Sequence, residues 1–315
     1  MSAFTKKRKD YRLKSKIFYA ALMAFPILQF CVFYIGVNFN SILLAFQNIT
    51  ISTDPSIGQQ VSWGFNNFTE WFTIEGNLQA ITTALSSSFT VYLISLFTGV
   101  PLGLLFSYYI YKKLLGSGMF RVFLFLPSIV SAIVMVLIFK YCVNEAVPTI
   151  IKQVFGVESM KGLLSNPETR FGTIVFYNIY VSFGTSVLMY SNKMAGISPE
   201  IIEAGHIDGV SQLQEFWHVV LPLTFPTLSI FLVTGVATLF TNQFNMYSFY
   251  GGIATVPDDK LITLGFYLYS KAQSAGIKVN ELPPLSALGL MMTLVAVPLT
   301  FTVRWALDKF GPSED

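Results

Sequence analysis

Six long stretches without a charged residue constrain the fold of this chain more than any other feature of its sequence. Of 315 residues only 12% are charged, against about a quarter in a typical soluble protein. Each stretch is about 18 residues or longer, which in a helix approaches the thickness of a bilayer core. The charge-free stretches are residues 17–53, 76–111, 122–139, 171–192, 219–257 and 282–303.

This pattern predicts an all-α membrane protein with six transmembrane helices. The composition excludes a water-soluble enzyme, and the continuous apolar runs exclude a closed β-barrel, because barrel strands alternate polar and apolar residues. We expect a basic tail over residues 1–16, one six-span domain over residues 17–308 and a short C-terminus over residues 309–315. The expected spans are residues 17–46, 79–111, 120–141, 171–190, 223–250 and 284–307.

The positions of lysine and arginine predict the orientation in the membrane. Residues 6–16 contain seven of them, whereas the segment between the first two spans contains none. Because Lys and Arg accumulate on the cytoplasmic side, we expect the N-terminus in the cytoplasm. An even number of spans returns the C-terminus to that side and places Lys112, Lys113 and Lys193 there as well.

The loop over residues 194–222, between the fourth and fifth spans, carries signals for a first short helix. Ser198 is a suitable N-cap, and Pro199 follows at the first helical position, where its missing N–H costs nothing. Gly209 suits the end of this helix.

A second short helix is predicted directly afterwards. Ser211 and Gln214 have the spacing of a capping box, and we expect Pro222 to break this helix before the next span. The sequence thus predicts a helix-turn-helix element on the cytoplasmic face of the membrane.

The first of these helices has an apolar stripe formed by Ile201, Ala204 and Ile207. Such a stripe either contacts a partner protein or packs on its own helix bundle, and the sequence leaves both possibilities open. DNA binding is disfavoured, because residues 194–216 contain no Lys or Arg. The same segment contains the acidic residues Glu200, Glu203, Asp208 and Glu215.

The loop resembles the EAA signature of bacterial ABC importer permeases, which usually reads EAA-x-x-DGA with a later I-x-L-P. The matching residues are Glu203-Ala204-Gly205-x-x-Asp208-Gly209-Val210 and Val219-x-Leu221-Pro222. The flanking Pro199-Glu200 and the spacing are similar to the carbohydrate-uptake branch of that family, the maltose and multiple-sugar type. Gly205 and Val210 replace alanines of the usual pattern, and both changes are small in volume.

The resemblance implies the type I ABC importer permease fold, in which this loop docks into a cleft of a separate ATPase. It implies that Glu203 meets basic groups of the ATPase and that Gly209 provides the turn. The chain has no G-x-x-x-x-G-K-[ST] motif, so ATP and Mg²⁺ are expected on the partner and this chain has no catalytic residues of its own. The expected coupling residues are Glu203, Ala204, Gly205, Asp208, Gly209, Leu221 and Pro222.

The same resemblance implies an assembly in the bacterial cytoplasmic membrane. Its other members would be a second, related permease that forms a heterodimer with this chain, a cytoplasmic ATPase dimer and an extracytoplasmic solute-binding protein. We expect no metal site, because neither the two cysteines nor His206 and His218 have a ligand-like spacing.

The fourth and fifth spans contain neutral polar residues and no charge, which weakens the case for a proton- or ion-coupled carrier. Amides and hydroxyls can bind sugar hydroxyls, but they also bond neighbouring helices to each other, and both interpretations stay open. Asn242 and Asn245, three residues apart, are expected on one helical face.

In the maltose-type permeases that the chain resembles, the sugar lies between the spans that flank the EAA loop. Matching on this loop implies the substrate contacts Asn178, Ser182, Thr185, Thr238, Thr241, Asn242 and Asn245. Because Thr241 stands where that family tends to carry an aromatic residue, Phe240 or Phe244 would supply the stacking ring, or the other permease would.

The sequence therefore predicts the permease subunit of an ATP-driven sugar importer that works by alternating access. The alternatives are a permease for another polar solute such as glycerol phosphate, an ATPase-independent facilitator or carrier, and a membrane sensor or scaffold.

Overall fold

A computed structural model describes residues 2–51, 59–74, 76–156, 161–275 and 279–312. Its contacts divide the chain into two compact units. The first comprises Met1–Thr73 with Ala275–Met291, and the second comprises Ile74–Ser274 with Met292–Asp315. Each unit is described by itself.

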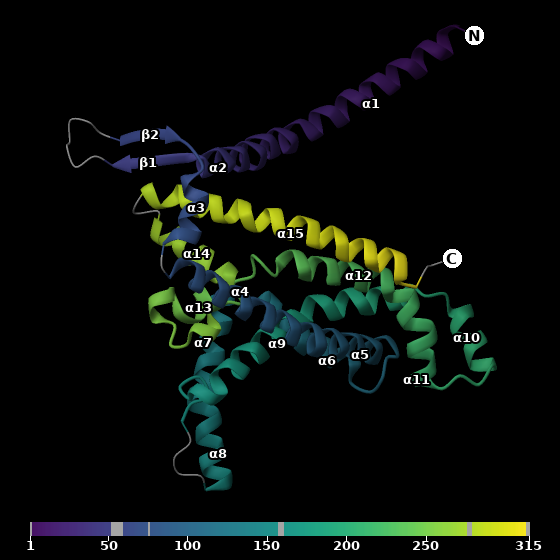
Figure 1. Cartoon of the computed structure of the whole chain (residues 1–315). Coiled ribbons are helices and arrows are strands. Elements are labelled where there is room, and N and C mark those ends of the chain that lie inside the picture. The colour runs from purple at the N-terminus through teal and green to yellow at the C-terminus, as the bar shows by residue number, and fades with distance from the viewer. Residues whose placement is uncertain (1, 52–58, 75, 157–160, 276–278, 313–315) are drawn as a thin grey trace. The chain divides into compact units, whose positions relative to one another are not determined.

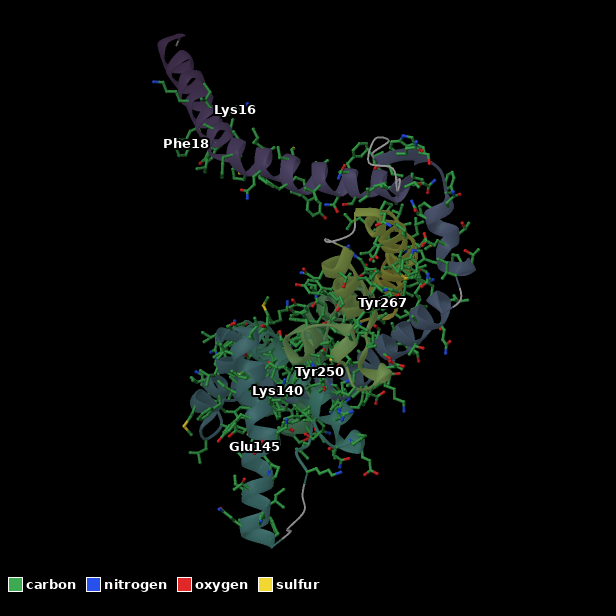
Figure 2. The ribbon with its side chains drawn as sticks, turned by 90° about the vertical axis from the view of Figure 1, so that its left-hand side faces the viewer. Lys16, Phe18, Lys140, Glu145, Tyr250 and Tyr267 are labelled. Atoms are coloured by element: carbon green, nitrogen blue, oxygen red, sulfur yellow. The ribbon has the colours of Figure 1, made fainter. Side chains whose placement is uncertain are left out.

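The first unit begins with one long, nearly uninterrupted helix. It consists of α1 (Ser2–Gln29), the π-helical turn η1 (Phe30–Gly36) and α2 (Val37–Ala45). From Lys14 onward its side chains project outwards, as Phe18 does in Figure 2, and Phe18 and Phe33 are 64% and 70% exposed. Apolar exposure of this extent is typical of a helix that contacts lipid or another protein.

A β-hairpin follows, which the sequence did not lead us to expect. Strands β1 (Gln47–Ile51) and β2 (Gln59–Trp63) pair antiparallel, with Ile49 opposite Val61 (Figure 1). The hairpin is tied to α3 (Asn66–Thr73), because the buried Asn67 Nδ2 donates to the carbonyls of Ala45 and Gln47 at 3.0 and 2.9 Å. Trp71 Nε1 donates to the Pro284 carbonyl at 2.7 Å, which joins α3 to the start of the last helix.

The second unit consists almost entirely of helices and short helical turns, and α15 runs from the first unit into it (Figure 1). Its elements up to the middle of the chain are α4 (Asn77–Ile94), η2 (Ser95–Gly99), α5 (Val100–Tyr111), α6 (Ser117–Ile129), α7 (Ala132–Tyr141), η3 (Cys142–Ala146), α8 (Val147–Phe155) and α9 (Pro167–Ala195). The later elements are α10 (Pro199–Ile207), α11 (Gln212–Glu215), η4 (Phe216–Val220), α12 (Leu221–Thr238), α13 (Met246–Tyr250), η5 (Ile253–Thr255), η6 (Asp259–Leu261) and α14 (Leu264–Ala275). The turn η7 (Val279–Glu281) belongs to the first unit and precedes α15 (Leu282–Phe310).

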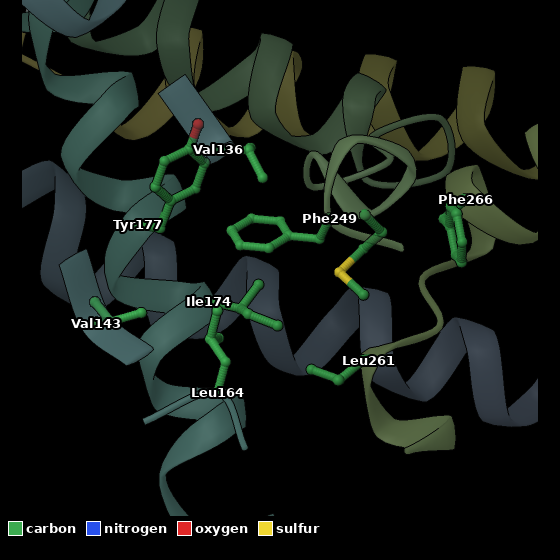
Figure 3. Packing of buried hydrophobic residues seen from close by; sticks show 9 residues of the cluster. Val136, Val143, Leu164, Ile174, Tyr177, Phe249, Leu261 and Phe266 are labelled. Atoms are coloured by element: carbon green, nitrogen blue, oxygen red, sulfur yellow. The ribbon is translucent and has the colours of Figure 1, made fainter. Parts of the chain in front are cut away.

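Helix α9 is the centre of the second unit and contacts α5, α6 and α12. Tyr177 of α9 is fully buried beside Val136 of α7 and Phe249 of α13, in the apolar cluster drawn in Figure 3. A second cluster joins α9 to α6 through Leu124. A third cluster joins the C-terminal end of α9 to Phe216 and Val220 of η4. Lys140 of α7 donates to the Phe249 carbonyl at 3.0 Å and lies 6.0 Å from the Tyr250 ring centroid (Figure 2).

The prediction of six spans is confirmed. Six helical segments among the described residues are long and apolar enough to cross a membrane. They are Lys14–Ala45, Asn77–Tyr111, Ala132–Phe155, Pro167–Ala195, Gln212–Thr238 and Leu282–Phe310.

Two expected spans have different boundaries from those predicted. The third, expected over residues 120–141, is divided between α6 and α7, because Val130 and Ser131 are extended with ψ of 144° and 135°. The fifth, expected over residues 223–250, ends as a helix at Thr238. A turn over residues 239–245 separates it from α13, so Asn242 and Asn245 do not share a helical face.

Candidate functional site

A cavity of about 320 Å³ in the second unit lies beside the turn formed by residues 239–245. Its lining is made of neutral polar, aromatic and aliphatic side chains, and none of them carries a formal charge. The lining residues are Ser88, Tyr92, Ser95, Leu96, Val100, Asn178, Val181, Ser182, Phe231, Leu232, Gly235, Thr238, Leu239, Asn242, Phe244 and Asn245.

The turn has an unusual backbone at its end. Phe244 and Asn245 adopt the left-handed region, with φ of 52° and 55°. Asparagine visits this region more readily than most residues, whereas phenylalanine does so at a cost. The Asn242 Oδ1 atom accepts a hydrogen bond from the Phe244 N–H at 2.9 Å, and this local bond stabilises the turn.

Asn178 of α9 holds the turn from one side. Its Nδ2 atom donates to the Phe244 carbonyl at 3.1 Å and to the Ile174 carbonyl of its own helix at 2.9 Å. Its Oδ1 atom accepts from Asn245 Nδ2 at 2.8 Å. The two asparagines that the sequence places 67 residues apart therefore bond directly to each other.

The start of α14 holds the turn from the other side. Thr263 Oγ1 donates to the Asn242 carbonyl at 3.0 Å. Gly265 approaches so closely that a Cβ on it would overlap the Thr241 carbonyl and lie 2.7 Å from the Asn242 carbonyl carbon. Only glycine fits this position without displacing the turn.

Five of the seven predicted substrate contacts line the cavity, namely Asn178, Ser182, Thr238, Asn242 and Asn245. Thr241 lines an adjoining open hollow, which shares Thr238, Asn242 and Asn245 with the cavity. Thr185 is exposed on α9 and is not part of either lining. Of the two predicted stacking rings, Phe244 lines the cavity, whereas Phe240 is buried.

Sequence reasoning missed the contribution of the second span. Ser88, Tyr92 and Ser95 line the cavity from α4 and η2. Their spacing of four and three residues puts them on one polar stripe, in a span that also carries Thr82, Thr83, Ser86, Ser87 and Thr90. That stripe was the available signal in the sequence.

A second feature, at the opposite end of α12 from the turn, is the element formed by α10 and α11 (Figure 1). Ser198 and Pro199 start α10 as predicted, although no side-chain hydrogen bond caps it. Gly209 has φ of 75°, a left-handed turn that glycine forms without strain. Ser211 and Gln214 form the predicted capping box.

Helix α10 presents its apolar stripe to the outside. It has no buried residue, and Ile201 and Ile207 are 45% and 85% exposed. Glu203, Ala204 and Asp208 are also exposed. The described part of the chain therefore leaves the stripe uncovered, contrary to the interpretation that it packs on its own bundle.

The expected break at Pro222 is wrong. The π-helical turn η4 leads from α11 directly into α12, and Pro222 lies within the first turn of α12. Pro222 therefore lies inside the continuous helical segment Gln212–Thr238, directly after the wider π-helical turn. Of the other predicted coupling residues, Gly205, Leu221 and Pro222 are half-buried.

Glu215 of α11 is buried and forms a charged cluster that the sequence did not reveal. Lys112 Nζ lies 2.9 and 3.0 Å from its two carboxylate oxygens. The Tyr108 hydroxyl donates to Oε1 at 3.2 Å, and His206 Nε2 lies 3.1 Å from Oε2. The available signal was the position of Lys112 and Glu215, each at the edge of a charge-free stretch on the same predicted side of the membrane.

Comparison with known proteins relates these features to a family. Residues 95–314 match the family described as binding-protein-dependent transport system inner membrane component. The multiple sugar-binding transport system permease protein MsmF of Streptococcus mutans is 24% identical over 234 residues, which are 74% of this chain and 76% of that protein.

Two further proteins are similar over different lengths. The maltose/maltodextrin transport system permease protein MalF of Escherichia coli K12 is 26% identical over 191 residues, 59% of this chain but only 37% of MalF. A chain of a bacterial ABC transporter involved in the import of the acidic polysaccharide alginate superposes with a TM-score of 0.72 at 19% identity, over 95% of this chain and 99% of that chain. The structural match shows the same fold, that of an ABC importer permease.

The family match covers the α10–α11 element and most of the cavity, in a chain whose described part holds six helices able to cross a membrane. This chain therefore belongs to the family of binding-protein-dependent transport system inner membrane components.

Proposed function

We propose that this chain is the permease subunit of an ATP-driven importer for neutral oligosaccharides. The observation that carries the proposal is the cavity beside residues 239–245, in which amides and hydroxyls stand next to aromatic rings. Amides donate to and accept from sugar hydroxyls, and an aromatic face covers the apolar side of a pyranose. The named functions of MsmF and MalF, both sugar transport permeases, agree with it.

The cavity favours a neutral solute over a charged one. A phosphorylated solute such as glycerol phosphate, or an acidic sugar such as alginate, needs a cationic partner away from water. The lining residues contain no Lys or Arg. The cavity therefore suits a neutral sugar best.

The proposed assembly contains this chain, a second permease, an ATPase dimer and an extracytoplasmic solute-binding protein, in the bacterial cytoplasmic membrane. Both chain termini and the α10–α11 element lie on the cytoplasmic side in this proposal. ATP and Mg²⁺ bind the ATPase dimer, and this chain supplies half of the translocation path.

The exposed face of α10 is the proposed docking surface for the ATPase. Glu203 and Asp208 offer carboxylates, and Ile201 and Ile207 offer uncovered apolar area to the same partner. When ATP closes the ATPase dimer, the element moves as a rigid body, and the bundle changes from inward-open to outward-open. The binding protein then releases sugar into the cavity.

The test uses the complete complex in proteoliposomes, with radiolabelled maltotriose as the first probe and an alginate trisaccharide as the acidic comparison. We expect ATP-dependent uptake of the neutral sugar. Glu203→Gln and Gly209→Val should each abolish uptake and the ATP hydrolysis that depends on it. Glu200→Gln, an exposed acid one turn earlier on α10, is the matched control.

Three results would contradict the proposal. Normal uptake and normal coupled hydrolysis in both variants would reject the docking role of the element. Uptake by this chain in the absence of an ATPase would favour the alternative of a facilitator. Uptake of the acidic sugar but not of the neutral sugar would reject the assignment of a neutral solute.

A further inference from the structure

A buried carboxylate helps to fasten the α10–α11 element to the bundle. Glu215 is 2% exposed, and the Lys112 side chain that pairs with it is 16% exposed. A carboxylate withdrawn from water needs several donors, and Glu215 has three side chains around it: Lys112, Tyr108 and His206.

These three donors come from two different parts of the fold. Tyr108 and Lys112 belong to the end of α5 and its C-cap, whereas His206 belongs to α10. The single hydrogen of the Tyr108 hydroxyl is shared between Glu215 Oε1 and the Gln212 carbonyl, which lies 3.0 Å from the hydroxyl, so α5 contacts the backbone of α11 as well as its carboxylate. One carboxyl group therefore links the exposed helix to a helix of the bundle.

The bundle side of this link is rigid. Phe216, next to Glu215, is 3% exposed and packs in one cluster with Leu104 of α5 and Tyr190 of α9. Its ring centroid lies 5.1 Å from that of Tyr108. Ser107 of α5 donates to the Val187 carbonyl of α9 at 3.2 Å. A displacement of α11 is thus transmitted to α5 and α9 together.

The α10 side of the link is weaker. This helix buries no residue, and His206, with a side chain 57% exposed, is its polar contact to Glu215. Ile202 is half-buried against the cluster of Phe216. A force applied to the exposed face of α10 can reach the bundle through these contacts as well as through the backbone on either side of the helix.

We propose that Glu215 is a mechanical joint: His206 couples α10 to it, and Tyr108 and Lys112 couple it to α5, so that movement of α10 becomes movement of the bundle. These are positioning residues that act on the transport cycle and contact neither sugar nor nucleotide. The inference rests on the proposed function and adds to it the route by which movement of α10 reaches α5.

The test measures the amount of radiolabelled maltotriose imported per ATP hydrolysed by the complete complex in proteoliposomes. His206→Ala removes the α10 side of the joint, and Tyr108→Phe removes one hydroxyl from the α5 side. Each should lower the ratio of sugar to ATP, by about fivefold for His206→Ala, the lower end of typical couplings between sites. Co-purification of the ATPase should remain at the wild-type level.

Two further variants separate a positioning role from a general structural one. His206→Gln keeps an N–H donor for Glu215 and should restore most of the ratio. His218→Ala removes the other histidine of this region, whose Nδ1 lies 3.1 Å from the Gln214 carbonyl one turn earlier in the chain, and should leave the ratio unchanged.

A wild-type ratio in either His206→Ala or Tyr108→Phe overturns the inference. Loss of the ATPase from the purified complex overturns it as well, because it would make these residues assembly contacts. If the wild-type complex fails to couple ATP hydrolysis to uptake of maltotriose or any other neutral oligosaccharide, the proposed function is overturned too. If the wild-type complex couples normally and the variants match it, only the proposed role of Glu215 as a joint is rejected.

Discussion

Asn178 shows how one amide can define the shape of a cavity. Its Nδ2 atom donates to the carbonyls of Ile174 and Phe244, and its Oδ1 atom accepts from Asn245. Both amide hydrogens are therefore used within the protein, which leaves only spare acceptor capacity for a ligand. Of the two interpretations of the polar residues in the spans, bonding between elements describes Asn178, while Asn242 and Thr238 are exposed to the cavity.

We expect Asn178→Ala to loosen the turn. The Phe244 carbonyl and the Asn245 amide lose their partner, which should cost about 1 kcal/mol of unfolding free energy and reduce sugar uptake. Thermal unfolding in detergent and uptake in proteoliposomes measure the two effects. Ser186→Ala is the control, because its hydroxyl bonds only to carbonyls of its own helix; an equal loss in both variants would contradict the role of Asn178.

Replacement of glycine by alanine should change the unfolding free energy in opposite directions at two glycines of the α10–α11 element. Gly209→Ala places a Cβ on a residue with φ of 75° and should cost about 1 kcal/mol. Gly205→Ala lies inside α10, where no atom comes within 4 Å of an added Cβ, and should stabilise the helix by about 1 kcal/mol. Unfolding curves of the two variants should shift in opposite directions, and a shift in the same direction would reject this explanation.

Local sequence rules worked well for residues whose partners are close in the chain. Ser211 and Gln214, three apart, form the predicted capping box, and Gly209 forms the predicted turn. They failed for Glu215 and Lys112, which meet only after two helices have packed. A pair separated by 103 residues leaves no local pattern to read.

At the level of elements, the apolar stretches predicted how many spans exist but not where two of them break. The third stretch contains Pro127, Ser128 and Ser131 within an otherwise apolar run, and its backbone is extended at Val130 and Ser131. The fifth contained a readable signal, because residues 241–245 are Thr-Asn-Gln-Phe-Asn. Thr and Asn are poor helix formers, and Asn favours left-handed turns.

The contact between α14 and the turn gives a prediction for these elements. Gly265→Ala would force the added Cβ against the Thr241 and Asn242 carbonyls, so the turn must shift. We expect reduced maltotriose uptake with little change in assembly of the complex. Gly289→Ala, where no atom lies within 4 Å of an added Cβ, is the comparison. Uptake by Gly265→Ala equal to that of Gly289→Ala would show that the turn tolerates displacement.

At the level of the whole molecule, two chains with few identical residues can share one fold when both keep apolar stretches long enough to span the membrane. The chain superposes on an alginate transporter chain with a TM-score of 0.72 at 19% identity. Its β-hairpin and the helix break at residues 239–245 are features that hydropathy does not encode. The orientation in the membrane is a prediction from the positions of Lys and Arg and the number of spans.

Cysteine labelling measures that orientation. In a chain with Cys31→Ser and Cys142→Ser, we expect Leu115→Cys, between α5 and α6 and 98% exposed, to react with a membrane-impermeant maleimide only after cells are permeabilised. Val154→Cys, near the end of α8 and 66% exposed, should react in intact cells. The reverse labelling pattern would place the α10–α11 element outside the cell and reject the proposed docking of an ATPase.

The break at Val130 and Ser131 also has a consequence for biosynthesis. Leu124 of α6 packs on α9, and Val136 of α7 packs on α9 and α13, which are both translated later. A nascent chain that has not yet reached these helices offers residues 122–139 to the membrane before the packing partners of α6 and α7 exist. The contacts that fix the two helices on either side of the break therefore form only after insertion, when α9 reaches both of them and α13 reaches α7.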